Sequence, residues 1–160
     1  MVKSVLPKIK KIVVVFSIIL GGAVSYCFIT DKSDPDWLSW VNKCLVQSFD
    51  PSPDVKLKKW ELTVTDDSFI RLRKTYQNGK QEYFSFQLHR LDDVGYIGDI
   101  NTGTLQLKAK ADDIIVQTYN DKKGDVDSMA TVLNIPVKNM EPARLNSLRT
   151  ALNYFKGKGL

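Results

Sequence analysis

The residues that most often do chemistry in proteins are few in this chain and far apart. The single histidine, His89, lies in a predicted strand, where alternation with Leu88 points it away from the core. One histidine and two cysteines fall short of the usual ligand set of a zinc site. The sequence has neither a glycine-rich phosphate loop nor a G-x-S-x-G nucleophile motif. We therefore predict no catalytic residues, no metal site and no small-molecule cofactor.

Acidic residues occur in three adjacent pairs, each predicted in a turn between strands. The pairs are Asp66–Asp67, Asp92–Asp93 and Asp112–Asp113. Aspartate favours turns because its carboxylate bonds to nearby backbone N–H groups. Carboxylates from separate turns can also meet in space as the acid and base of a hydrolase. An envelope hydrolase that uses these turn carboxylates therefore remains an alternative function.

The remaining chemistry is that of recognition. The polar side of the predicted sheet carries Arg71, Arg73, Tyr83 and His89. Arginine and tyrosine are enriched at binding hot spots because they combine a large contact area with polar groups. The glycine-rich segment 92–103, with Tyr96, is predicted as a short strand between tight turns that can approach a partner closely. These residues form the candidate interaction face, and a protein is the predicted partner.

The stretch from Ile12 to Ile29 holds eighteen residues without a charge. As a helix it would extend about 27 Å, close to the thickness of a bilayer's hydrocarbon core. Lysines precede it and aspartates follow it: Lys3, Lys8, Lys10 and Lys11, then Asp31, Asp34 and Asp36. This asymmetry predicts a cytoplasmic N-terminus. We predict a basic cytoplasmic segment (1–11), a transmembrane signal anchor (12–30) and an extracytoplasmic, periplasmic domain (31–160) on the inner membrane.

Two alternatives to the signal anchor stay open. Small residues at Ala23 and Ser25 fit a signal peptide that is cleaved after Ser25, although the apolar run continues past that point. Lipid attachment at Cys27 is the third possibility. The state of the cysteines follows from this choice, since Cys44 is an unpaired thiol if Cys27 lies in lipid, and can pair with it if both are exported.

The net charge of +5 does not indicate a nucleic-acid partner. The basic excess lies in the four lysines before residue 12. Residues 31–160 carry 19 basic and 18 acidic side chains, so they lack the basic patch typical of nucleic-acid binding.

The periodicity of the remaining chain predicts an α+β domain. An amphipathic helix over 34–49 ends at Pro51 and Pro53, and five or six strands follow in an antiparallel meander. Pro136 excludes a central strand position for the segment 129–137. A C-terminal helix over 142–155 is expected to pack with the first helix on one face of the sheet.

Asn78-Gly79 marks a hairpin between strands 69–76 and 80–91, and its register can be predicted. A three-residue loop, 77–79, with a left-handed Gly79 pairs Ile70 with Phe86 and Leu72 with Phe84, and sets Lys74 opposite Glu82. A two-residue loop would place arginines opposite these phenylalanines. Because a one-residue slip moves every side chain to the other face, the hydrophobic match favours the longer loop.

Together these features predict a membrane-anchored, single-pass module of the cell envelope that binds a protein. One form of this function is an inhibitor or immunity protein that neutralises a toxin or enzyme acting in the envelope. The alternative is a structural subunit of a secretion, conjugation or division assembly in the membrane.

Overall fold

The computed structural model describes residues 34–158. The predicted spanning segment (12–30), the lysines before it and Cys27 lie outside these residues. The elements in chain order are α2 (Asp34–Ser48), β1 (Leu57–Val64), β2 (Phe69–Tyr76), β3 (Gln81–Gln87), the 3₁₀ helix η1 (Leu88–Arg90), β4 (Leu91–Gly98), β5 (Thr102–Ala109), β6 (Ile114–Tyr119), β7 (Asp127–Ala130), β8 (Val132–Lys138) and α3 (Pro142–Lys158). The domain is α+β with antiparallel strands, as predicted. Within residues 34–158 no helix is both long and apolar enough to cross a bilayer.

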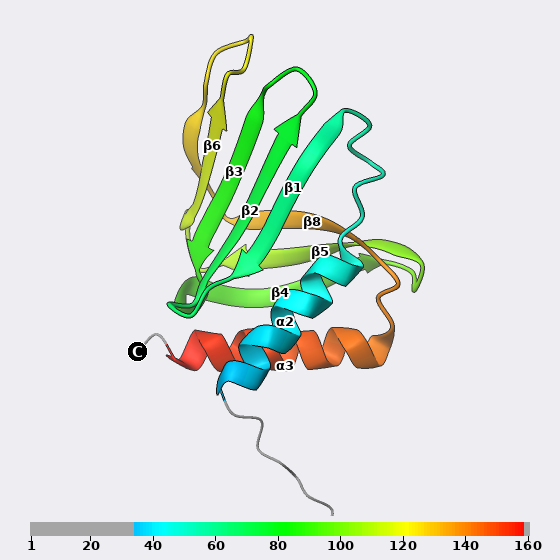
Figure 1. The fold of residues 1–160 in the computed structure, drawn as a ribbon. Helices are drawn as coiled ribbons and strands as arrows, with labels where there is room; N and C mark the ends of the chain where they lie inside the picture. Colours follow the sequence, from blue (N-terminus) through cyan, green and yellow to red (C-terminus); the bar gives the residue numbers. More distant parts are fainter. Residues whose placement is uncertain (1–33, 159–160) are drawn as a thin grey trace, which may run out of the picture. The chain divides into compact units, whose positions relative to one another are not determined.

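The strands form two sheets, so the prediction of one meander was wrong. A five-stranded sheet has the order β1-β2-β3-β6-β7, and a three-stranded sheet has the order β4-β5-β8 (Figure 1). The chain leaves the first sheet through η1. Leu88 and Leu91, three residues apart, are both fully buried there. A strand would place them on opposite faces, whereas a 3₁₀ turn directs both to the same side.

The chain returns to the five-stranded sheet between β5 and β6, and changes sheets a third time at Thr131, the single residue between β7 and β8. Its carbonyl accepts a hydrogen bond from the Ala109 backbone N–H at 2.8 Å, which ties the crossing to the end of β5. β8, which contains Pro136, is an edge strand of its sheet. This confirms the predicted exclusion of a central position, because proline has no N–H to donate to a second neighbouring strand.

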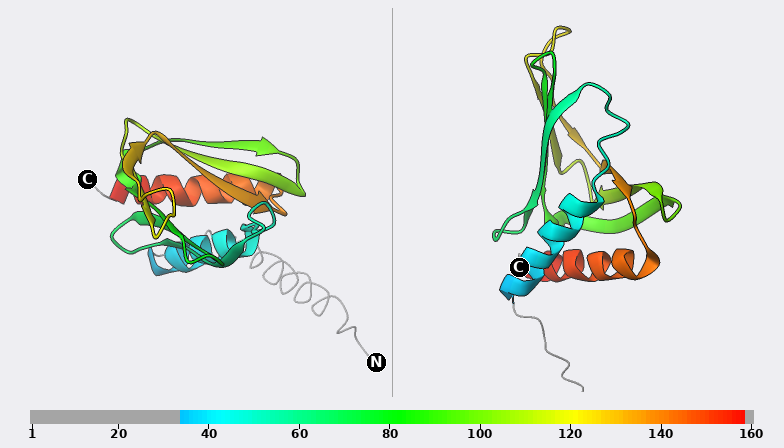
Figure 2. Two further views of the ribbon diagram at one scale, coloured as in Figure 1. Left: turned by 90° about the horizontal axis from the view of Figure 1, so that it is seen from above. Right: turned by 45° about the vertical axis from the view of Figure 1, so that its right-hand side comes forward.

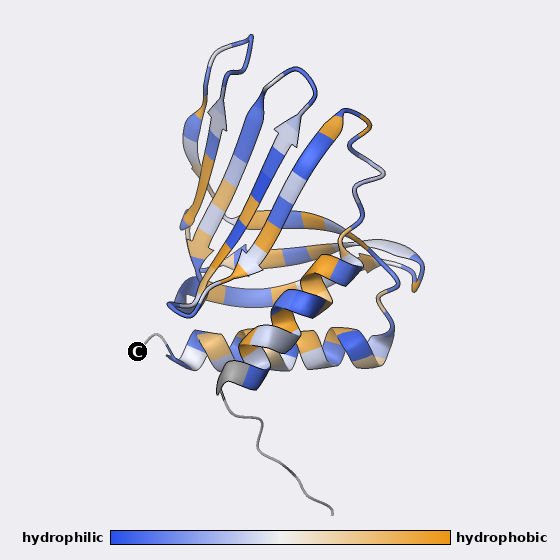
Figure 3. Cartoon of the chain, in the orientation of Figure 1, coloured by the Kyte–Doolittle hydropathy of each residue, from blue (hydrophilic) through white to orange (hydrophobic). Residues whose placement is uncertain are grey.

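One hydrophobic core joins the two sheets and the two helices. α2 packs against β1, and α3 packs against η1, β4 and α2, rather than both helices covering one sheet face as predicted (Figures 1 and 2). The predicted apolar stripe of α3 is buried, with Leu145, Leu148, Ala151, Leu152 and Phe155 at 9% exposure or less. Hydrophobic and hydrophilic residues alternate along the strands, as expected for sheets with one buried face (Figure 3).

The β2–β3 hairpin has the predicted register. Ile70 pairs with Phe86, Leu72 with Phe84 and Lys74 with Glu82. The loop is residues 77–79, closed by the hydrogen bond from Tyr76 N to Lys80 O at 2.9 Å, and Gly79 has a φ of 86°. The register turns Ile70, Leu72 and their partners toward the core and the arginines of β2 away from it.

Candidate functional site

The face of the five-stranded sheet that points away from the core, here called the outer face, brings three predicted site residues together. Two rows of paired residues cross it. One row is Thr63, Arg71, Ser85, Ile115 and Met129; the next is Glu61, Arg73, Tyr83, Gln117 and Asp127. Arg71, Arg73 and Tyr83 therefore lie near the centre of this face. Neither helix has its main contacts here, since α2 approaches β1 through core residues such as Val41 and Leu45, and α3 contacts mainly η1 and α2.

The outer face is hollowed around the arginines. One hollow of about 260 Å³ is lined by Glu61, Thr63, Thr65, Arg71, Arg73 and Tyr83. A second of about 300 Å³ is lined by Arg73, Gln81, Tyr83, Gln117 and Tyr119. Arg73 and Tyr83 line both, so a partner that fills either hollow contacts these two side chains.

Aromatic rings support both guanidinium groups. The Cζ atom of Arg71 lies 5.3 Å from the centroid of the Phe69 ring, and that of Arg73 lies 5.7 Å from the Tyr83 ring. Such cation–π contacts hold a charged group over a ring without using its N–H donors. Among residues 34–158 neither guanidinium has an ion pair, and the buried Nε of Arg71 has no hydrogen-bond acceptor. The outer face thus offers fixed, unused donors suited to planar acidic groups.

His89 does not belong to this face, and the prediction that it lies on the third strand was wrong. β3 ends at Gln87, and His89 lies in η1, where the chain turns toward the other sheet. Its side chain is half-buried, and its Nδ1 atom has no partner among the described residues. The turn arises because Leu88 and Leu91 both enter the core, which ends the strand two residues before the histidine.

Tyr96 also lies apart from the arginines, because β4 belongs to the three-stranded sheet. Its hydroxyl donates to the carbonyl of Asp99, and a Cβ on Gly103 would come within 2.3 Å of that hydroxyl. Burial and the Asp99 carboxylate raise the pKa of Tyr96. The ring therefore closes over the β4–β5 turn, and Gly103 is required by this packing within the hairpin.

The three acidic pairs lie on three different segments of the fold. Asp66 and Asp67 lie in the β1–β2 turn and Asp113 in the β5–β6 turn, where Asp113 pairs with Arg90 at 3.0 Å. Asp92 and Asp93 lie in β4 and not in a turn as predicted, beside a break in register after Leu91. In the part of the chain described, no three histidine, cysteine or acidic side chains cluster as a metal site would require.

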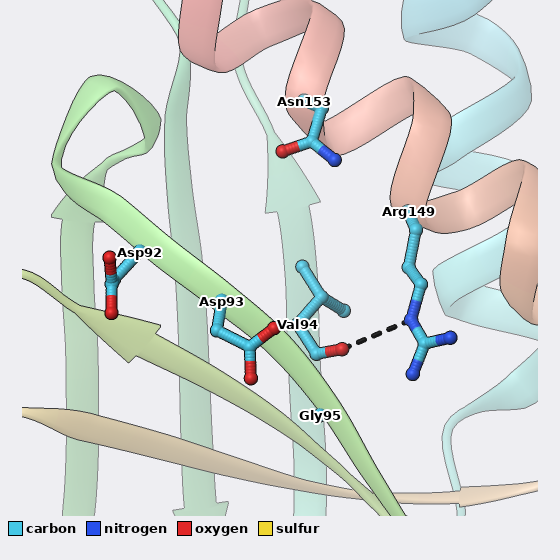
Figure 4. A pocket seen from close by; sticks show the side chains of 6 residues that line it. All are labelled: Asp92, Asp93, Val94, Gly95, Arg149 and Asn153. Carbon is cyan, nitrogen blue, oxygen red and sulfur yellow. Dashed lines mark hydrogen bonds between the residues drawn. The ribbon is translucent and has the colours of Figure 1, made fainter.

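Sequence reasoning missed a cavity of about 430 Å³ between β4 and α3. It is lined by Asp92, Asp93, Val94, Gly95, Arg149 and Asn153. Arg149 and Asn153 extend from α3, and the Nε of Arg149 donates to the Val94 carbonyl at 3.0 Å (Figure 4). The two helix residues are four apart and off the apolar stripe, but only the packing of α3 on β4 brings them to the aspartates.

Cys44, on α2, is a free and buried thiol. Burial raises its pKa, against the smaller opposing effects of the Arg144 charge and the Ser48 hydroxyl. A buried thiol with a raised pKa is poorly nucleophilic, which does not favour a reactive cysteine at this position.

Comparisons of the chain with protein-family models, with curated proteins and with solved structures found no match.

Proposed function

We propose that this protein is a membrane-anchored, extracytoplasmic interaction module that binds a protein partner through the outer face of its five-stranded sheet. The observation that carries this proposal is the combination of two arginines with unused donors and a tyrosine at the centre of a face that neither helix packs on. Groups of this kind dominate binding energy at many interfaces.

The membrane part of the proposal is supported by the uncharged run 12–29 and the lysines before it. An anchor would raise the local concentration of the outer face for any partner that reaches the membrane surface. A reporter enzyme fused after Leu160 should be active outside the cytoplasm and stay with membranes after a salt wash. Release of a shorter soluble form would instead support cleavage after Ser25.

The form that we favour is an inhibitor, such as an immunity protein that neutralises a toxin or enzyme acting in the envelope. One small domain with one preorganised face suits a single tight partner. Crosslinking the full chain in its native membrane and recovering it should yield one soluble protein. The triple variant Arg71→Ala, Arg73→Ala, Tyr83→Ala should lose that protein.

A matched control keeps this experiment interpretable. Lys110, Asp112 and Asn146 are exposed and lie outside the strands of the five-stranded sheet. Their triple alanine variant should recover the partner as the unmodified chain does. Equal recovery by both triple variants would move the contact surface away from the outer face.

A structural subunit of a membrane assembly is the second candidate, and the open edge of the sheet favours it. At the β1 edge, Asn42 of α2 covers the Val64 end, where its side chain accepts from Val64 N–H at 2.7 Å and donates to Val64 C=O at 2.8 Å. In residues 34–158, β7 pairs on one side only, with β6. A neighbouring strand could extend the sheet there, and recovery of several membrane proteins together would support this candidate.

A further inference from the structure

The five arginines of the chain fall into two groups. Three have an oxygen partner: Arg90 with the Asp113 carboxylate at 3.0 Å, Arg144 with the Ser48 hydroxyl at 3.3 Å, and Arg149 with the Val94 carbonyl at 3.0 Å. Arg71 and Arg73 have neither an ion pair nor a hydrogen bond within residues 34–158, although Arg71 is half-buried. A partly buried guanidinium normally finds an oxygen partner. Arg71 lacks one within residues 34–158, and Arg73 beside it is exposed.

The two unpaired arginines share one hollow. They lie two residues apart on the outer face of β2, so their side chains leave the sheet side by side. Thr63 and Tyr83 also line the hollow of about 260 Å³, as does Thr65, whose hydroxyl already donates to Asp67. Guanidinium forks match the planar, two-oxygen geometry of a carboxylate.

We infer that this hollow binds the carboxylate of an aspartate or glutamate on the protein partner, with Arg71 as its main ligand and Arg73 beside it. The inference rests on the proposed function, since it names the group by which the partner is recognised. Glu61 lines the same hollow. Its negative charge opposes a doubly charged inorganic phosphate or phosphomonoester more strongly than a singly charged carboxylate.

The Nε–H of Arg71 gives the site its specificity for a planar acid. This donor is shielded from water and has no acceptor in the structure while the guanidinium lies over Phe69. A small rotation away from the ring would let one carboxylate bond to Nε and a terminal nitrogen together. Lysine cannot reproduce this paired geometry, because its ammonium is a single point of charge.

The test follows the Nε–H signals of all five arginines by NMR. The full chain, labelled with ¹⁵N-arginine and held in neutral detergent micelles, is titrated with a blocked tripeptide that has glutamate at its centre. The Nε–H signals of Arg71 and Arg73 should shift saturably, while those of Arg90 and Arg149 stay in place. The same peptide with glutamine should cause little shift. The variant Arg71→Lys should weaken glutamate binding, read from Arg73, by about tenfold or more.

Three results would overturn the inference. Equal shifts at all five arginines would indicate general ionic attraction, and an unmoved Arg71 would exclude a carboxylate site. A larger response to inorganic phosphate, or to micelles that contain an anionic phospholipid, would assign the hollow to phosphate. Unchanged Arg144 and Arg149 backbone signals in Arg71→Lys show that this variant is folded.

The peptide titration tests the carboxylate site, and the recovery of the partner tests the proposed contact surface, so either can be contradicted without the other. If the glutamate peptide binds but the triple alanine variant still recovers the partner, the carboxylate site stands and the proposed contact surface is wrong. If the triple variant loses the partner while no peptide shifts Arg71, the contact surface stands and recognition by a carboxylate is wrong.

Discussion

The two faces of the β2–β3 hairpin differ in whether their charged residues form ion pairs and hydrogen bonds within the domain. On the core side, beyond the apolar residues, Lys74 pairs with Asp54 at 2.6 Å, and the Tyr76 hydroxyl donates to Glu82 at 2.8 Å. Lys80 pairs with Glu82 at 3.0 Å and with Asp121 at 2.9 Å. On the outer face, Arg71 and Arg73 lie near aromatic rings and form no ion pair within residues 34–158, although Glu61 is opposite Arg73.

This difference separates charges that hold the fold from charges that are available to a partner. The paired groups connect the hairpin to the segments before β1 and after β6, and burial together with Glu82 raises the pKa of Tyr76. The outer arginines connect no segments. Residues that contribute little to folding and are costly to leave unpaired are expected at a binding surface, where the partner completes their hydrogen bonds.

The largest effect that would test this contrast is a truncation on the core side. Phe86 is 1% exposed and opposite Ile70, so Phe86→Ala should lower the free energy of unfolding by about 3–5 kcal/mol. Tyr83→Ala, on the outer face of the same strand, should cost about 1 kcal/mol or less. Urea unfolding followed by tryptophan fluorescence measures both. Similar losses would mean that the outer face is packed rather than open.

An intermediate effect is expected when a core-side pair is broken. Lys74→Met leaves the Asp54 carboxylate without its partner, and the side chains of the pair are only 12% and 26% exposed. The free energy of unfolding should fall by about 1–2 kcal/mol. Lys108→Met is the matched control, because its contact with Asp93 is 3.5 Å long and 45% and 58% exposed. That control should change stability by less than about 0.5 kcal/mol, and a larger loss there than at Lys74 would contradict the assignment of roles.

The sequence predicted the outer face because one local pattern fixed it. The alternation of Ile70 and Leu72 with Arg71 and Arg73, matched against Phe84 and Phe86, specifies both the register and the face of each residue. The three-residue loop 77–79, with a left-handed Gly79, produces the same register. Arg71, Arg73 and Tyr83 could therefore be placed together before any tertiary contact was known.

The sequence did not predict the features that depend on contacts between distant segments. Nothing in 88–91 distinguishes a continuing strand from a 3₁₀ turn until a second sheet exists to receive Leu91. Because of this ambiguity, the prediction grouped His89 and Tyr96 with the outer-face residues, whereas the structure places them elsewhere. The cavity between β4 and α3 has the same origin, since the segments that line it lie more than fifty residues apart in the chain.

The smallest stability effect expected differs in sign from the others. Arg71→Met removes a buried donor that has no acceptor, places an unbranched apolar side chain against Phe69, and relieves repulsion from Arg73. The free energy of unfolding should stay the same or rise, by up to about 1 kcal/mol. Arg90→Met is the control, because Arg90 pairs with Asp113, and its loss should lower stability by about 0.2–1 kcal/mol. Urea unfolding of the two variants under identical conditions gives the comparison. A loss of more than about 1 kcal/mol in Arg71→Met would show that the guanidinium stabilises the sheet, and the division between the two faces would then fail at its central residue.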